Sequence, residues 1–123
     1  MTDQPLLDSA VLDDLFDYIG ADAAQSIIGM FLGESRDFAA RISAATPDTA
    51  GRDMVRRAAH SLKRSAGQLG AVALAAAAEQ VEHTAEHGKS DLSELAEALR
   101  KCASETEFGL TELLNSELLG GRS

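Results

Sequence analysis

The stretch TAGRDMVRRAAHSLKRSAGQLG, residues 49–70, is followed by AVALAAAAEQVEHTAEH, residues 71–87, and together they have the pattern of two helices joined at a glycine. In the first segment apolar residues recur at separations of three and four, which places them on one side of a helix. These residues are Val55, Ala58, Ala59, Leu62, Ala66 and Leu69. Gly70 is expected to end this helix and allow a tight turn. The second segment has small apolar residues that permit close approach of the two helices.

Residues before this pair extend the helical pattern towards the N-terminus. Asp8 or Ser9 can cap a short first helix that Gly20 closes. A second helix is expected to begin near Asp22 and to end where Thr46, Pro47 and Asp48 interrupt the pattern. Its apolar positions are Ile27, Ile28, Phe31, Leu32, Phe38 and Ile42.

Residues after the pair predict one more helix. A turn at Gly88–Ser90 precedes a helix that starts at Ser90 or Asp91. Its apolar seam has spacings of three, four and seven, and consists of Leu92, Leu95, Leu99, Cys102, Thr106, Leu110 and Leu113. Short connections between long helices favour antiparallel neighbours. The sequence therefore predicts an all-α fold, an antiparallel four-helix bundle with a short additional N-terminal helix, in one domain spanning residues 1–123.

Composition excludes several classes of function. A formal net charge of -9 over 123 residues repels nucleic acids and anionic membrane surfaces. The single cysteine, Cys102, rules out an internal disulfide and is typical of a reducing compartment. The sequence predicts no signal peptide or membrane span, it contains no glycine-rich phosphate loop, and no cofactor is expected. These features predict a cytoplasmic monomer that obtains any phosphate from another protein and has no kinase activity of its own.

The basic residues are concentrated in one segment. Five of the eleven Lys and Arg residues lie between positions 52 and 64. Residues three, four or seven apart share a helix face, so His60 is surrounded by Asp53, Arg56, Arg57, Lys63, Arg64 and Gly67. This cation-rich surface is compatible with two functions. It can be a solvated face through which a non-catalytic helical adaptor binds acidic signalling proteins, or it can support chemistry at the histidine.

The chemistry that such a surface permits is phosphoryl transfer. A neutral imidazole is a competent nucleophile, and neighbouring cations disfavour its protonated form while attracting an incoming phosphoryl group. Phosphoryl transfer requires in-line positioning and stabilisation of charge on the equatorial oxygens, which Lys63 and Arg64 could provide. A small helical bundle is sufficient for this task.

The segment HSLKRSAGQLG, residues 60–70, resembles the signature H-x-[LI]-K-G-x-[SA]-x-x-[hydrophobic]-G of the histidine phosphotransfer (HPt) family. The preceding Ala58 and Ala59, the alanine-rich helix with Glu82 and the upstream segment LDDLFDYIGADAAQSIIGMFL are also similar to the family. The resemblance implies a phosphorelay intermediate of a two-component system. Its partners would be receiver domains of response regulators or hybrid histidine kinases.

Residue by residue, the resemblance implies that His60 is the phosphoacceptor, through Nε2, and that Lys63 lies beside the phosphoryl oxygens. Glu82 occupies a position where similar domains often have a Glu or Gln that orients the histidine through Nδ1. Arg64 replaces the usual glycine, and its side chain can either pair with phosphate or an acidic receiver surface, or partly cover His60. We further expect the partner to bind beside the histidine, at Arg56, Arg57, Gly67 and Gln68.

Two features have alternative interpretations. Gly67 can allow close approach of a partner or serve helix packing. Residues 83–87, HTAEH, match the metalloprotease pattern H-x-x-E-H, but such short patterns produce many false positives. A polar face near a helix C-terminus is the preferred explanation for His83 and His87. We therefore expect no metal site.

Overall fold

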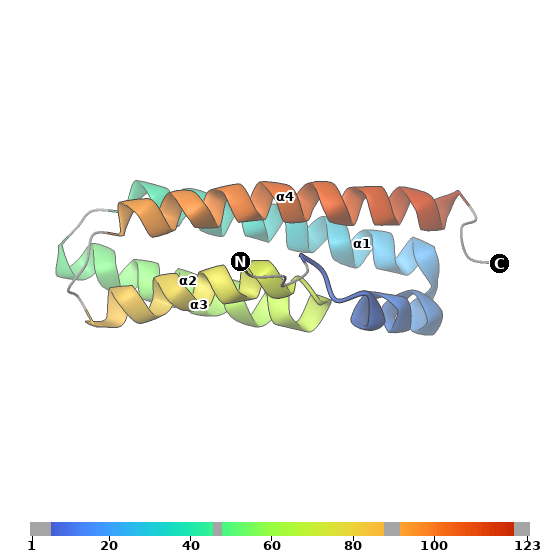
Figure 1. Cartoon of the computed structure of the whole chain (residues 1–123), viewed down its shortest axis with the longest axis horizontal. Helices are drawn as coiled ribbons and strands as arrows, with labels where there is room; N and C mark the ends of the chain where they lie inside the picture. The colour runs from blue at the N-terminus through green and yellow to red at the C-terminus, as the bar shows by residue number, and fades with distance from the viewer. Residues whose placement is uncertain (1–5, 46–47, 88–91, 120–123) are drawn as a thin grey trace.

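The computed structural model describes residues 6–45, 48–87 and 92–119, in which four helices follow one another (Figure 1). These are α1 (Ser9–Ala44), α2 (Thr49–Leu69), α3 (Val72–His87) and α4 (Ser93–Leu118). Successive helices run in opposite directions, as Figure 1 shows. α2 contacts α1 and α3, and α4 contacts α3 and α1, so the four form a closed ring of neighbours. The predicted all-α four-helix bundle is confirmed.

The predicted additional N-terminal helix is wrong as a separate element. Residues from Ser9 onward belong to α1, which continues to Ala44 with Gly20 at φ 84° and ψ 163° inside it. These angles kink the helix, but helical residues flank the glycine directly and no loop separates the two segments. Gly20, which was predicted to end a helix, therefore marks a kink within α1. In Figure 1 the first segment of α1, in dark blue, lies beside the end of the bundle where α2 turns into α3.

Local hydrogen bonds explain where the helices begin and end. Asp8 Oδ1 accepts from the backbone N–H of Ala10 at 3.0 Å, and Asp48 Oδ1 accepts from that of Gly51 at 2.8 Å. Gly70, at φ 84° and ψ 13°, ends α2 in the left-handed conformation as predicted. The predicted helix break at Thr46 and Pro47, the turn at Gly88–Ser90 and the helix start at Ser90 or Asp91 lie outside the described residues.

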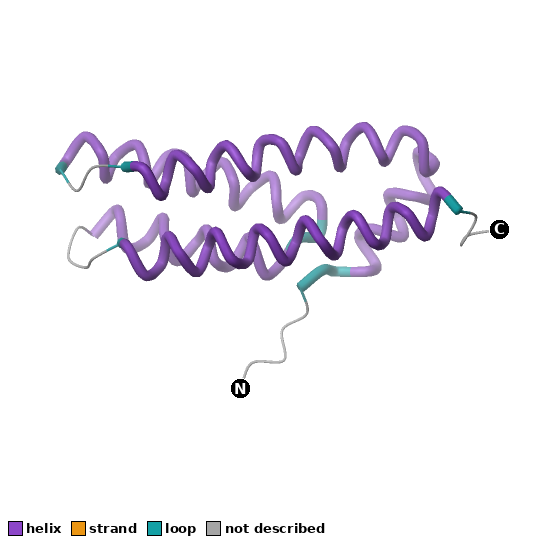
Figure 2. The backbone as a smooth tube through the Cα atoms, turned by 90° about the horizontal axis from the view of Figure 1, so that it is seen from above, coloured by secondary structure: helices purple, strands orange, loops and turns teal. Residues whose placement is uncertain are grey.

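The core between the helices contains the whole predicted stripe of α2 and part of the predicted seam of α4. All six residues of the α2 stripe are buried, as are Leu99, Thr106 and Leu110 of α4. In α3 the buried positions Ala78 and Ala85 are small, which allows α2 to approach closely. Figure 2 shows the helices from above, lying lengthwise beside one another. Because one face of α2 is fixed in this core, the opposite face, with His60, is directed to solvent.

The N-terminal segment of α1 is attached to the α2–α3 turn. The backbone N–H of Asp8 donates to Gly70 O at 2.7 Å, and that of Ala73 donates to Leu6 O at 3.4 Å. A Cβ atom at Gly70 would lie 3.1 Å from Val11 Cβ and 3.2 Å from Asp8 O.

Among the described residues, none of the helices combines the length and apolar character needed to cross a membrane.

Replacing Gly70 by alanine is expected to lower the free energy of unfolding by about 1–3 kcal/mol, because a Cβ would strain the left-handed backbone and crowd Val11. Gly33→Ala is the matched control, since a Cβ at this helical glycine meets nothing within 4 Å. That variant should be unchanged or up to about 1 kcal/mol more stable. Urea unfolding of both variants measures the difference. Equal effects of the two substitutions would contradict the role given to Gly70.

Candidate functional site

His60 lies in the middle of α2, on the face opposite the core. Its neighbours Ala59 and Leu62 are fully buried at 0% exposure, so the helix geometry turns the imidazole outward. The His60 side chain is 48% exposed. A docking molecule can therefore reach the ring.

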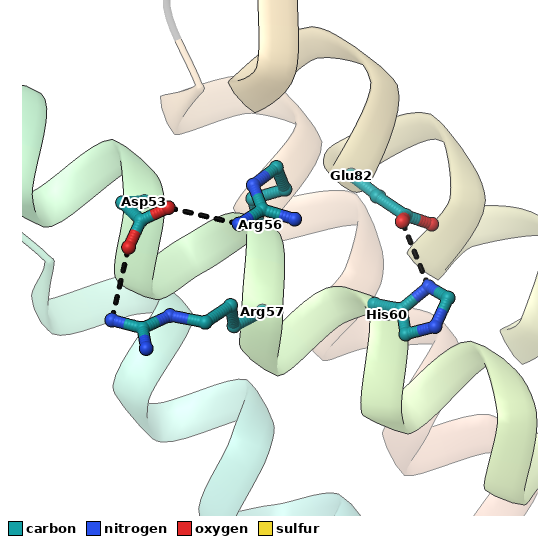
Figure 3. A network of polar contacts seen from close by, with 5 residues as sticks. All are labelled: Asp53, Arg56, Arg57, His60 and Glu82. Carbon is teal, nitrogen blue, oxygen red and sulfur yellow. Dashed lines mark hydrogen bonds and ion pairs between the residues drawn. The ribbon is translucent and has the colours of Figure 1, made fainter.

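A carboxylate from α3 holds the imidazole in place. Glu82 Oε2 lies 2.8 Å from His60 Nδ1, and Glu82 Oε1 lies 3.0 Å from Lys63 Nζ. An ionised carboxylate only accepts hydrogen bonds, so Nδ1 carries the hydrogen and donates it. Figure 3 shows that the other ring nitrogen, Nε2, points away from Glu82. In the neutral tautomer fixed by this contact, Nε2 has a free lone pair.

Glu82 remains ionised although it is largely shielded from solvent. Burial by itself raises the pKa of this carboxyl, but hydrogen bonds from Lys63 and His60 lower it more, and the net pKa is below the ordinary value. The side chain is only 16% exposed. The carboxylate is thus a stable hydrogen-bond acceptor for the imidazole at neutral pH.

Two of the arginines that were predicted to bind the partner form ion pairs with Asp53. Asp53 Oδ1 lies 2.9 Å from Arg56 Nη2, and Asp53 Oδ2 lies 2.9 Å from Arg57 Nη2 (Figure 3). The hydrogen bond from Arg56 and the charge of Arg57 lower the pKa of Asp53. All three residues were predicted to lie around His60, but their pairing was not predicted. Their spacings of three and four along a helix are the signal that could have shown it.

The other residues that were predicted beside the histidine are exposed. Arg64 has no hydrogen bond or ion pair with another residue in ranges 6–45, 48–87 and 92–119. A Cβ at Gly67 would meet nothing within 4 Å, so the alternative that this glycine serves helix packing is wrong. Gln68 is also exposed and lines shallow grooves between α1 and α2.

An apolar surface lies next to these residues on α1. Tyr18 is 91% exposed and Met30 is 70% exposed, and Ile27 is exposed although the sequence pattern placed it with the core residues. They lie along two adjoining grooves that share Leu15, Gln68 and Leu69. Ile19, by contrast, packs against the core. Met30 was not predicted to belong to a binding surface, although its spacing from Ile27 is that of one helix face.

The histidines of the H-x-x-E-H pattern lie at the C-terminal end of α3. Their ring centroids are 4.2 Å apart, and His87 Nδ1 lies 2.8 Å from the backbone oxygen of His83. Within the described part of the chain, no group of three or more His, Cys, Asp or Glu side chains is placed to hold a metal ion.

Comparisons with known proteins agree with this arrangement. The family model described as Hpt domain matches residues 26–115. Among solved structures, the crystal structure of histidine-containing phosphotransfer protein B from Pseudomonas aeruginosa PAO1 is similar, with a TM-score of 0.81 and 24% sequence identity. The match covers 90% of this chain and 96% of that one, and it shows a shared fold. A search of curated proteins finds no match.

Replacing Glu82 by glutamine should lower stability at neutral pH and have less effect in acid. A carboxyl whose pKa is lowered by folding stabilises the protein above its unfolded-state pKa, and this stabilisation is lost as the pH falls through the folded-state pKa. The wild type should therefore lose its advantage over Glu82→Gln at acidic pH. Glu79→Gln, at an exposed position of the same helix, is the control. Urea midpoints measured from pH 3 to pH 7 test this. A difference that does not depend on pH would contradict it.

Proposed function

The chain belongs to the Hpt domain family, and from this membership and the site geometry we propose that it is a phosphorelay intermediate with His60 as its phosphoacceptor. Members of the family carry out histidine phosphotransfer and have receiver domains as partners. In this proposal one receiver aspartate donates a phosphoryl group to His60, and a second receiver accepts it. The observation that supports the site most directly is the exposed imidazole whose Nδ1 is held by Glu82.

The transfer step uses the lone pair of Nε2. This lone pair attacks the phosphorus of the receiver's aspartyl phosphate, and an N–P bond forms as the P–O bond to the aspartate breaks. The electron pair of the P–O bond stays with the departing carboxylate. No proton has to move, because Nδ1 keeps its hydrogen throughout. The reverse sequence of bond changes delivers the phosphoryl group to the next receiver.

Glu82 has a second role in this step. When Nε2 bonds to phosphorus while Nδ1 keeps its hydrogen, the imidazole ring becomes formally cationic. The carboxylate 2.8 Å from Nδ1 then faces a positive charge that was not present before attack. Charge-assisted hydrogen bonds are stronger than neutral ones, so Glu82 stabilises the phosphorylated state and the transition state that leads to it.

The receiver is proposed to dock over His60 and onto the apolar surface of α1. Tyr18, Ile27 and Met30 expose apolar area on α1, next to the α2 residues Gln68 and Leu69. Gly67 has open space around it, which permits close approach of a partner backbone. Adjacent cations on α2 suit the acidic pocket of a receiver. The family membership and the single cysteine are consistent with a cytoplasmic location.

Incubation of the chain with a phosphorylated receiver should produce an acid-labile, alkali-stable phosphoryl label that is absent in His60→Gln. His83→Gln is the matched control, since His83 is an exposed histidine of α3 outside the proposed site, and it should label normally. Full labelling of His60→Gln would contradict the assignment of the site. If the wild type bound receivers but never acquired a label, the chain would be the non-catalytic adaptor instead.

Replacing Met30 or Ile27 by serine should slow transfer from a receiver about tenfold, because an apolar contact at the interface is lost. Labelling of the same variants by phosphoramidate, a small donor that needs no docking surface, should stay at the wild-type rate. Phe108→Ser is the control, because Phe108 is similarly exposed but lies on α4, which does not contact α2. An equal effect of all three substitutions on receiver transfer would argue against this docking surface.

A further inference from the structure

The cations on the His60 face differ in whether an acidic group already binds them. Asp53 pairs with Arg56 and Arg57, and Glu82 pairs with Lys63. Arg64 is the exposed cation of this face for which the described residues provide no hydrogen bond or ion pair. Exposed ion pairs are weak and exchange easily, so pairing alone does not decide which cation reaches a phosphoryl group.

The direction of helical side chains supplies the second criterion. In an α-helix the Cα–Cβ bonds tilt towards the N-terminus, so a long side chain covers the turn that precedes its own Cα. Lys63 and Arg64, three and four residues after His60, therefore lean over the histidine. Arg56 and Arg57 precede it and lean away, and Figure 3 shows the Arg57 side chain extending to Asp53, on the side away from His60. Only two cations of this face are thus directed at the imidazole.

Of these two, Lys63 is committed to Glu82. Its Nζ lies 3.0 Å from Glu82 Oε1, and the other oxygen of that carboxylate holds His60 Nδ1. Movement of Lys63 to a phosphoryl group on Nε2 would remove one of the two donors that keep a largely shielded carboxylate ionised. It would do so just when the imidazole becomes cationic and needs that carboxylate most.

We propose that Arg64 is the residue that contacts the phosphoryl oxygens, and that Lys63 is a positioning residue that acts through Glu82. This assignment rests on the proposed phosphotransfer at His60, and it gives to Arg64 the phosphoryl contact that the family signature implies for Lys63. The guanidinium is planar and can donate two parallel hydrogen bonds to two phosphoryl oxygens. During transfer it balances the charge on the equatorial oxygens, while the N–P bond forms and the electron pair of the broken P–O bond leaves with the receiver's aspartate.

The test loads His60 with phosphoramidate and follows the phosphoryl group by ³¹P NMR as the pH is varied. A guanidinium in contact with the phosphoryl oxygens stabilises their dianion, so its removal should shift the titration of the ³¹P signal to higher pH. Arg64→Gly, which introduces the residue usual in the family, should show this shift. Arg64→Lys should shift the titration less, because a cation remains beside the phosphoryl group. Lys63→Met should titrate like the wild type.

The role of Lys63 has a separate readout in the unphosphorylated chain. The ¹⁵N shifts of His60 report which ring nitrogen carries the hydrogen, and Lys63→Met should reduce the fraction of the Nδ1–H tautomer. Lys63→Arg should restore this fraction, and Arg64→Gly should leave it unchanged. Helical circular dichroism of each variant checks that the fold is intact.

The possible failures are distinguishable. A larger ³¹P shift in Lys63→Met than in Arg64→Gly would overturn the assignment of Arg64 and leave phosphotransfer at His60 standing. An unchanged tautomer in Lys63→Met would overturn the positioning role of Lys63. If phosphoramidate labels no histidine in the wild type, or labels His60→Gln equally, both this assignment and the proposed function are wrong.

Discussion

The Glu82 carboxylate is the contact on which the site depends. It reaches from α3 to α2, accepts a hydrogen bond from His60 Nδ1 through one oxygen and binds Lys63 Nζ through the other. Without it the imidazole could rotate and exchange tautomers on a solvent-exposed helix face. With it, the neutral ring keeps its hydrogen on Nδ1 and directs Nε2 outward. One shielded carboxylate thus sets the orientation, the tautomer and the charge balance of the histidine.

The bundle makes this contact possible. The small residues of α3 bring that helix close to α2, and the left-handed Gly70 reverses the chain so that Glu82 faces His60 across the two helices. The first segment of α1 closes over the turn, where Asp8 bonds to Gly70 O. The site therefore requires little besides the tight α2–α3 turn and an apolar stripe that turns the opposite face of α2 to solvent. The apolar residues of α1 beside the histidine are also exposed to solvent and can contact a partner.

Much of this could be predicted from the sequence because the patterns involved are local. Spacings of three and four identified the buried stripe of α2, and Gly70 marked its end. The motif around His60, together with Glu82, pointed to the residues that the structure brings together. The N-terminal helix was misassigned because a glycine such as Gly20 gives the same sequence signal at the end of a helix and at a kink inside one. The exposure of Ile27 and the lack of packing around Gly67 depend on which helices are neighbours, and a single sequence does not contain that information.

Pairing among the charged residues was predictable only in part. The helical spacing of Asp53 from Arg56 and Arg57 indicates their ion pairs, whereas the contact between Lys63 and Glu82 depends on how α2 and α3 pack. Five basic residues within one segment predicted a cation-rich face, and in the structure Asp53 and Glu82 bind three of them and leave Arg64 available. In the proposed phosphorelay the phosphoryl group is carried on Nε2 of His60, while Nδ1 remains the donor to Glu82. The most direct measurement is ³¹P–¹⁵N coupling in ¹⁵N-labelled protein phosphorylated by a receiver, which identifies the bonded nitrogen. We expect coupling to Nε2 of His60, whereas coupling to Nδ1, or to a different histidine, would contradict the proposed role of this residue.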